Sequence, residues 1–99
     1  MYRIEIVPGA IEELNSAPIF YRRILITAIE RKLPFEPTRA NRNRKVLESL
    51  VAGFEYDPPL WELRVQEWRI FYDVDEEEKK VIIRAVRRKP HGRTTGEVV

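Results

Sequence analysis

The first third of the chain has the apolar spacing of one strand followed by two helices. Residues 2–7 alternate between apolar and polar side chains, which predicts a half-buried strand that ends at Pro8-Gly9. Residues 10–14 predict a short helix. Between residues 19 and 33 apolar side chains recur at steps of three and four, which predicts an amphipathic helix that Pro34 ends. The predicted buried stripe of this helix consists of Phe20, Ile24, Leu25, Ala28, Ile29 and Leu33.

The second half of the chain has the composition of an antiparallel meander. Residues 60–65, 68–74 and 80–86 are rich in β-branched and aromatic side chains, and short polar connectors separate them. Before them, the polar residues 34–43 predict a loop, while residues 44–47 fit either a short strand or a turn. The chain therefore changes from helical to strand patterning near its middle.

A two-residue turn at Gln66-Glu67 fixes which side chains of the meander share a face. With that turn, Arg64 lies directly opposite Arg69, and both arginines occupy one face of the hairpin. The other face is apolar and is predicted to pack on the two N-terminal helices; it carries Trp61, Leu63, Val65, Trp68, Ile70, Tyr72 and Val74. We therefore favour core packing over base stacking for both tryptophans.

These elements predict an α+β fold, with two N-terminal helices on an antiparallel sheet of about four strands and one partly exposed sheet face. A chain of 99 residues is long enough for one hydrophobic core and too short for two. We therefore expect a single domain spanning residues 1–99.

Composition narrows the classes of function. No run approaches the roughly 18 apolar residues of a membrane helix, and the N-terminus lacks the apolar core of a signal peptide, so we expect a cytoplasmic protein without a membrane partner. The chain has no Cys and one His, which excludes disulfides, a thiolate nucleophile and Cys-based zinc sites. We expect neither a cofactor nor a metal site.

The charges are more informative in their distribution than in their sum. The formal net charge is only +2, but acidic side chains crowd into residues 73–78, whereas basic ones crowd into residues 39–45 and 84–93. Basic segments of this kind indicate an anionic partner.

The segment from Leu60 to Asp75, LWELRVQEWRIFYDVD, resembles the central hairpin of the RelE/ParE superfamily of toxins from bacterial type II toxin–antitoxin pairs. The basic run from Asn41 to Lys45 resembles the basic loop of one subgroup, and the order of elements also matches. The resemblance covers nearly the whole chain. It implies a RelE-like fold and a cognate antitoxin protein as partner.

The resemblance implies two activities on one fold, and fold alone does not choose between them. RelE-like members cleave messenger RNA on the ribosome, whereas ParE-like members inhibit DNA gyrase without being enzymes. We take a metal-independent, ribosome-dependent messenger RNA endonuclease as the leading interpretation, with the ribosome and messenger RNA as partners. A gyrase inhibitor, or a degenerate member that binds antitoxin without toxicity, is the alternative.

Arg69 matches the arginine that contacts the scissile phosphate in RelE-like members. Attack by a ribose 2′-hydroxyl builds negative charge on a pentacoordinate phosphate, which a planar guanidinium can bind. The alternative is an exposed strand arginine paired with Glu62 or Asp73. Because Arg69 is predicted on the exposed sheet face, we expect its truncation to cost little stability under either interpretation. Arg64, opposite Arg69, needs an anion or a carboxylate nearby to relieve the repulsion between the two charges.

The basic tail holds the other candidate catalytic residues. The resemblance places a residue that stabilises the leaving group at Lys89, or at Arg88 if the register shifts by one. His91 is a candidate for proton transfer, because its ordinary pKa lies near neutrality. A solvated tail with an incidental His is the competing interpretation, and the chain lacks the C-terminal Tyr of RelE-like members.

Further basic side chains are candidates for contacts with a nucleic-acid backbone, which require only accessible positive charge. The alternative is a solvated surface. These candidates are Arg42, Arg44, Lys45, Arg84, Arg87 and Arg93.

Overall fold

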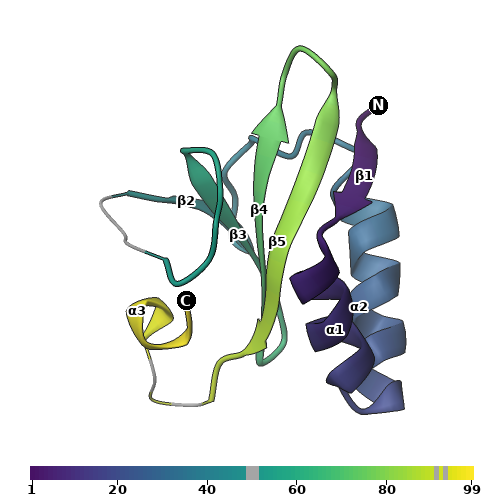
Figure 1. Ribbon diagram of the computed structural model, residues 1–99, viewed down its shortest axis with the longest axis vertical. Coiled ribbons are helices and arrows are strands. Elements are labelled where there is room, and N and C mark those ends of the chain that lie inside the picture. Colours follow the sequence, from purple (N-terminus) through teal and green to yellow (C-terminus); the bar gives the residue numbers. More distant parts are fainter. Residues whose placement is uncertain (49–51, 91, 93) are drawn as a thin grey trace.

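A five-stranded sheet carries two helices on one face and the C-terminal segment on the other in the computed structural model (Figure 1). The structure describes residues 1–48, 52–90, 92 and 94–99. The strands are β1 (Arg3–Ile6), β2 (Arg44–Leu47), β3 (Leu60–Val65), β4 (Trp68–Asp75) and β5 (Lys80–Arg88). The helices are α1 (Pro8–Ser16), α2 (Ile19–Lys32) and α3 (Thr95–Val98).

The α+β class is confirmed, with two differences from the expected sheet. The strand order is β1-β5-β4-β3-β2, and the fifth strand is β2, which pairs antiparallel with β3. The first strand, β1, runs parallel to β5, so the sheet is not antiparallel throughout. Alternation of apolar and polar side chains identifies a strand but does not show which strand it pairs with. The direction of β1 relative to β5 depends instead on the path of the chain through α1 and α2.

The helices cover one sheet face with the residues that the spacing indicated. Leu25, Ala28 and Ile29 of α2 are buried against the sheet, but Phe20 is 65% exposed and does not belong to the stripe. Helix α1 begins at Pro8, where the sequence indicated only the end of a strand. Proline is favoured in the first helical turn, because the N–H that it lacks would have no partner there.

The apolar hairpin face forms the core as expected. Both tryptophans are buried: Trp61 stacks on Tyr72 with ring centroids 6.5 Å apart, and Trp68 contacts Tyr21 of α2. Their packing favours a structural role over base stacking. Among the described residues, no helix is long and apolar enough to cross a membrane.

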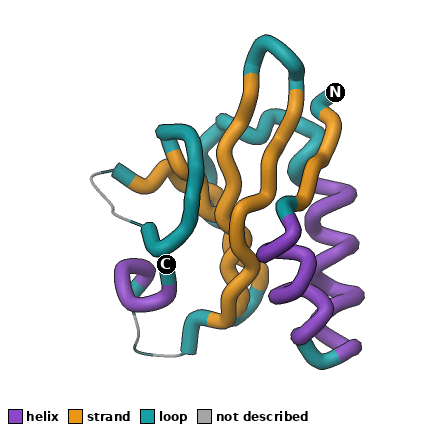
Figure 2. The backbone as a smooth tube through the Cα atoms, viewed as in Figure 1, coloured by secondary structure: helices purple, strands orange, loops and turns teal. Residues whose placement is uncertain are grey.

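The opposite sheet face is less exposed than the sequence indicated. Phe71 and Ala85 pack there with Phe54 of the loop before β3 and with Val98 of α3, in a second, smaller apolar cluster. Figure 2 shows this loop and α3 lying together on the side of the sheet away from α1 and α2. The rest of this face is polar and carries the candidate site.

Candidate functional site

A pocket on the polar sheet face brings together side chains from four parts of the chain. Its lining consists of Asn41, Arg42, Asn43, Arg44 and Lys45 around the start of β2, Glu62 and Arg64 of β3, Arg69 of β4, and Lys89 after β5. Of these residues, six are basic and one is acidic. So strong an excess of positive charge in a hollow attracts an anion.

Buried hydrogen bonds anchor the loop that carries the basic residues at the pocket edge. The Arg44 guanidinium donates to the carbonyls of Glu36 at 2.7 Å and Lys32 at 3.0 Å. The Tyr72 hydroxyl donates to the Pro37 carbonyl at 2.6 Å, and burial raises the pKa of Tyr72, so that the hydroxyl keeps its proton. Arg44 therefore lines the pocket mainly as a structural anchor, and its side chain is buried.

Arg69 is buried at the centre of this face, not exposed as the sequence indicated. Its Nε lies 3.0 Å from a Glu62 carboxylate oxygen, and its Nη1 donates to the carbonyls of Gln66 and Trp68, both at 2.8 Å. Burial lowers the pKa of Arg69 and the Glu62 charge opposes that shift, but an arginine keeps its proton in proteins. The guanidinium is therefore a charged group held in one orientation.

The predicted opposition of Arg64 and Arg69 is confirmed and extends to a third arginine. Arg64 pairs with Arg69 across β3 and β4, and Arg69 pairs with Arg87 across β4 and β5. Arg87 is neutralised by Glu13 of α1 at 2.9 Å and donates to the Val98 carbonyl at 2.8 Å. Arg64 is exposed and has no ion-pair partner within the described ranges. Its charge is thus available to a ligand.

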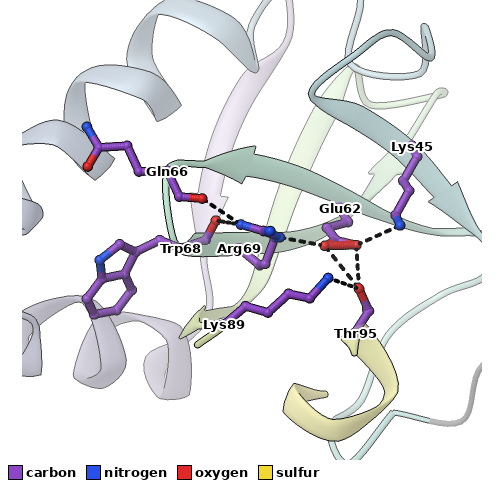
Figure 3. A network of polar contacts seen from close by, with 7 residues as sticks. All are labelled: Lys45, Glu62, Gln66, Trp68, Arg69, Lys89 and Thr95. Carbon is purple, nitrogen blue, oxygen red and sulfur yellow. Dashed lines mark hydrogen bonds and ion pairs between the residues drawn. The ribbon is translucent and has the colours of Figure 1, made fainter. Parts of the chain in front are cut away.

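Glu62 connects the cations of the pocket (Figure 3). Its carboxylate pairs with Arg69 and lies 3.8 Å from the Lys45 Nζ. It also accepts from the Thr95 hydroxyl, whose oxygen lies 3.1 Å and 3.3 Å from the two carboxylate oxygens. The Lys89 Nζ in turn donates to the Thr95 hydroxyl oxygen at 3.5 Å. One network therefore joins β2, β3, β4, the tail and α3.

Several predicted residues lie outside this network. Arg88 pairs with Glu67 at 3.0 Å on the surface, and Arg84 pairs with the buried Asp73 at 2.7 Å. Neither side chain lines the pocket. His91 and Arg93 lie outside the described residues, so their roles remain predictions.

Sequence reasoning considered Glu62 only as a carboxylate partner of Arg69 or of the Arg64–Arg69 pair, and it missed Thr95. Glu62 carried a usable signal, because alternation along β3 places it on the same face as Arg64. Thr95 carried none, since it is 33 residues from Glu62 in sequence and reaches it only through the fold.

The fold described above is similar to that of several solved protein structures. No family model and no curated protein matches the sequence. The structure of the RelBE2 toxin–antitoxin complex from Mycobacterium tuberculosis matches with a TM-score of 0.71 and 23% identity, over 89% of this chain and 98% of that one. The archaeal RelE–RelB complex from Pyrococcus horikoshii OT3 matches with a TM-score of 0.68 and 26% identity, over 94% of this chain and 98% of that one.

The isolated RelE toxin from E. coli matches with a TM-score of 0.68 and 17% identity, over 98% of this chain and 94% of that one. In this chain, a small sheet has two helices on one face and the basic pocket on the other. The chain has the fold of the RelE superfamily, and the resemblance seen in the sequence is confirmed at that level.

Proposed function

We propose that this chain is the toxin of a type II toxin–antitoxin pair and a metal-independent endonuclease that cleaves messenger RNA on the ribosome in the cytoplasm. The observation that supports the proposal best is the pocket around Arg69, with six basic residues and one acidic residue on a RelE fold. An electropositive hollow of this kind fits a phosphodiester, whose charge increases in the transition state.

The proposed reaction is attack of a ribose 2′-hydroxyl on the adjacent phosphorus. The new P–O bond closes a 2′,3′-cyclic phosphate, the P–O5′ bond breaks, and the proton lost from the 2′-hydroxyl is balanced by one gained by the 5′-oxygen. Arg69 and Arg64 bind the phosphate oxygens, and Lys89 stabilises charge on the leaving oxygen. His91 is the proposed proton carrier.

Arg42 and Lys45 are the proposed contacts with the RNA backbone next to the scissile phosphate. Both side chains are exposed at the edge of the pocket, and Lys45 also contacts Glu62. Contacts of this kind bind phosphates without reading the bases, so they position the strand. Codon preference would then arise from the ribosome and from other parts of the surface.

We prefer the RelE-like activity to gyrase inhibition because the similar structures reported above are RelE proteins. Two of them are complexes with an antitoxin, which supports a cognate antitoxin for this chain as well. An extended acidic segment of such an antitoxin would complement the basic pocket and mask it.

The test is cleavage of a defined message on programmed ribosomes by the purified chain, either untreated or stripped with EDTA that is removed before mixing, because the ribosome itself requires Mg²⁺. We expect cleavage in both conditions, at a site that depends on the ribosome, and fragments that end in 2′,3′-cyclic phosphate. Intact message combined with inhibition of DNA gyrase would instead establish the ParE-like alternative. Intact message with no effect on gyrase would identify a non-toxic member.

A further inference from the structure

Glu62 is the one acidic residue that lines the pocket among the described residues, and its burial is unusual for a carboxylate. The residue is 2% exposed. In the sheet register it lies opposite Lys45 of β2, and it is two residues from Arg64, the direct partner of Arg69. A buried carboxylate costs free energy unless partners satisfy it, and Glu62 has Arg69, Lys45 and Thr95.

The contacts of Arg69 determine which of its N–H groups an anion can reach. A guanidinium has five N–H groups in a fixed fork. Glu62 binds the Nε side, and two main-chain carbonyls bind Nη1. Within the described ranges, Nη2 has no hydrogen-bond partner, although Arg69 lines the pocket. The Nη2 amino group is therefore the part of Arg69 left for a ligand.

The second contact of Glu62 reaches Lys89 through the C-terminal helix. The Thr95 hydroxyl donates to the Glu62 carboxylate and accepts from the Lys89 Nζ (Figure 3). The Glu62 carboxylate of β3 therefore anchors both Thr95 and, through it, Lys89 of the tail. Lys89 also has its main chain fixed, since its N–H donates to the Glu67 carbonyl at 2.6 Å. The orientation of Lys89 toward the pocket thus depends partly on Glu62.

We propose that Glu62 is a positioning residue: it orients Arg69 so that Nη2 faces the scissile phosphate, and through Thr95 it holds Lys89 on the same pocket. This inference rests on the proposed nuclease function. A carboxylate repels a phosphate, and the oxygens of Glu62 already pair with Arg69 and accept from Thr95, so Glu62 acts on the cations and not on the substrate. Its effect on the reaction passes through the two cations.

The proposal predicts that substitution of Glu62 slows RNA cleavage without weakening RNA binding. Replacing Glu62 with Gln removes one negative charge beside the pocket, which strengthens the attraction for an anion. The same change frees Arg69 to adopt orientations that do not fit the transition state. Misplacement of a group by about 1 Å can cost about 100-fold in rate. Glu62→Gln should therefore bind RNA at least as tightly as the wild type, yet cleave it more slowly.

The experiment measures single-turnover cleavage on programmed ribosomes and, separately, the binding of a message with a 2′-O-methyl group at the cleavage site. For Glu62→Gln we expect a rate about 100-fold lower with unchanged or tighter binding. Thr95→Val, which breaks the link to Lys89 alone, should lower the rate about fivefold, as expected for one lost hydrogen bond. Glu78→Gln is the matched control. Glu78 pairs with Arg3 on the exposed surface, so this variant should cleave like the wild type.

A second measurement does not depend on activity. In NMR spectra of the free protein, the Arg69 Nε–H should exchange slowly with water in the wild type and in Thr95→Val, and quickly in Glu62→Gln. Rapid exchange in the wild type would overturn the positioning role, even if the protein cleaved RNA. Slow exchange in a wild-type protein that cleaves nothing would support the orientation of Arg69 and refute the proposed function.

Three further outcomes would refute the inference alone. A folded Glu62→Gln protein that cleaves as fast as the wild type would show that Glu62 does not position the catalytic cations. Weaker RNA binding with an unchanged cleavage rate would indicate a role in binding, contrary to the proposal. A lower melting temperature with normal cleavage by the folded fraction would show that Glu62 is structural only.

Discussion

At the scale of single residues, the burial of Arg69 changes what its substitution can reveal. Truncation to Ala would leave the Glu62 carboxylate buried without its closest cation. Breaking such a pair costs about 3 kcal/mol, more than the small loss expected of an exposed arginine. We predict that Arg69→Ala lowers the free energy of unfolding by about that amount and abolishes message cleavage. Urea denaturation and cleavage by the folded fraction measure the two effects.

The matched control for Arg69→Ala removes both charges together. In the double variant Glu62→Leu, Arg69→Met the pocket floor becomes apolar, and replacement of a buried pair by apolar side chains is often neutral for stability. We expect the double variant to regain most of the lost stability and to remain inactive. Recovery of cleavage together with stability would mean that Arg69 has no catalytic role.

Lys89 and Arg88 offer a comparison between neighbouring basic residues. Lys89 lines the pocket and contacts Thr95, whereas Arg88 pairs with Glu67 on the surface. We predict that Lys89→Ala lowers the single-turnover rate by about 100- to 1,000-fold, the range for loss of one group that stabilises charge in the transition state. Arg88→Ala should stay within about twofold, because a surface ion pair contributes little. The reverse order would place the leaving-group contact at Arg88.

At the scale of elements, the loop between α2 and β2 depends on two buried donors. Tyr72 of β4 and Arg44 of β2 bind carbonyls of this loop, which leads into the basic edge of the pocket. Figure 1 shows this segment passing behind the sheet before it enters β2. The orientation of Arg42 and Lys45 therefore depends on hydrogen bonds made beneath them.

We predict that Tyr72→Phe lowers stability by about 1 kcal/mol, the typical contribution of a hydrogen bond, and weakens binding of the uncleavable message severalfold. Loss of the anchor lets the loop move, so the phosphate contacts of the loop become less favourable. Tyr2→Phe is the control, since its hydroxyl binds Glu76 in an exposed position. Equal effects of the two substitutions on RNA binding would exclude an anchoring role for Tyr72.

At the scale of the whole molecule, the charges are divided between the two ends of the sheet. The turn between β4 and β5 carries the acidic run Glu76, Glu77 and Glu78, and it lies at the opposite end of the sheet from the turn between β3 and β4 (Figure 1). The lining of the basic pocket includes Arg64 and Arg69, which pair one residue away from the β3–β4 turn. The formal net charge of only +2 does not reveal this separation of acidic and basic side chains. An anionic partner therefore meets one strongly basic region instead of a uniformly charged surface.

This separation of charges predicts that the complex with a cognate antitoxin is sensitive to salt. Between about 50 mM and 500 mM NaCl, the dissociation constant should rise, chiefly through slower association, because salt screens the attraction between exposed charges. Surface plasmon resonance with the co-purified antitoxin measures this dependence. Arg42→Ser combined with Lys45→Ser should reduce the slope, and a complex indifferent to salt would refute an electrostatic interface.

The sequence by itself determined β1, the two N-terminal helices, the three strands of the meander and one face of the sheet, but not β2 or α3. Alternation along β3 and β4 identified the core residues, and the Gln66-Glu67 turn set Arg64 opposite Arg69, because a two-residue hairpin leaves one register. The order of elements was enough to predict the α+β class. These features depend on neighbours in sequence, which is why local patterns reveal them.

Only the tertiary structure decided what surrounds Arg69. The parallel pairing of β1 with β5, the cover over Phe71 and the Thr95–Glu62 contact all join segments distant in sequence. No periodicity encodes such contacts, because they depend on how the elements pack in space. Burial followed from that packing as well, and it turned a predicted surface arginine into a fixed, partnered one.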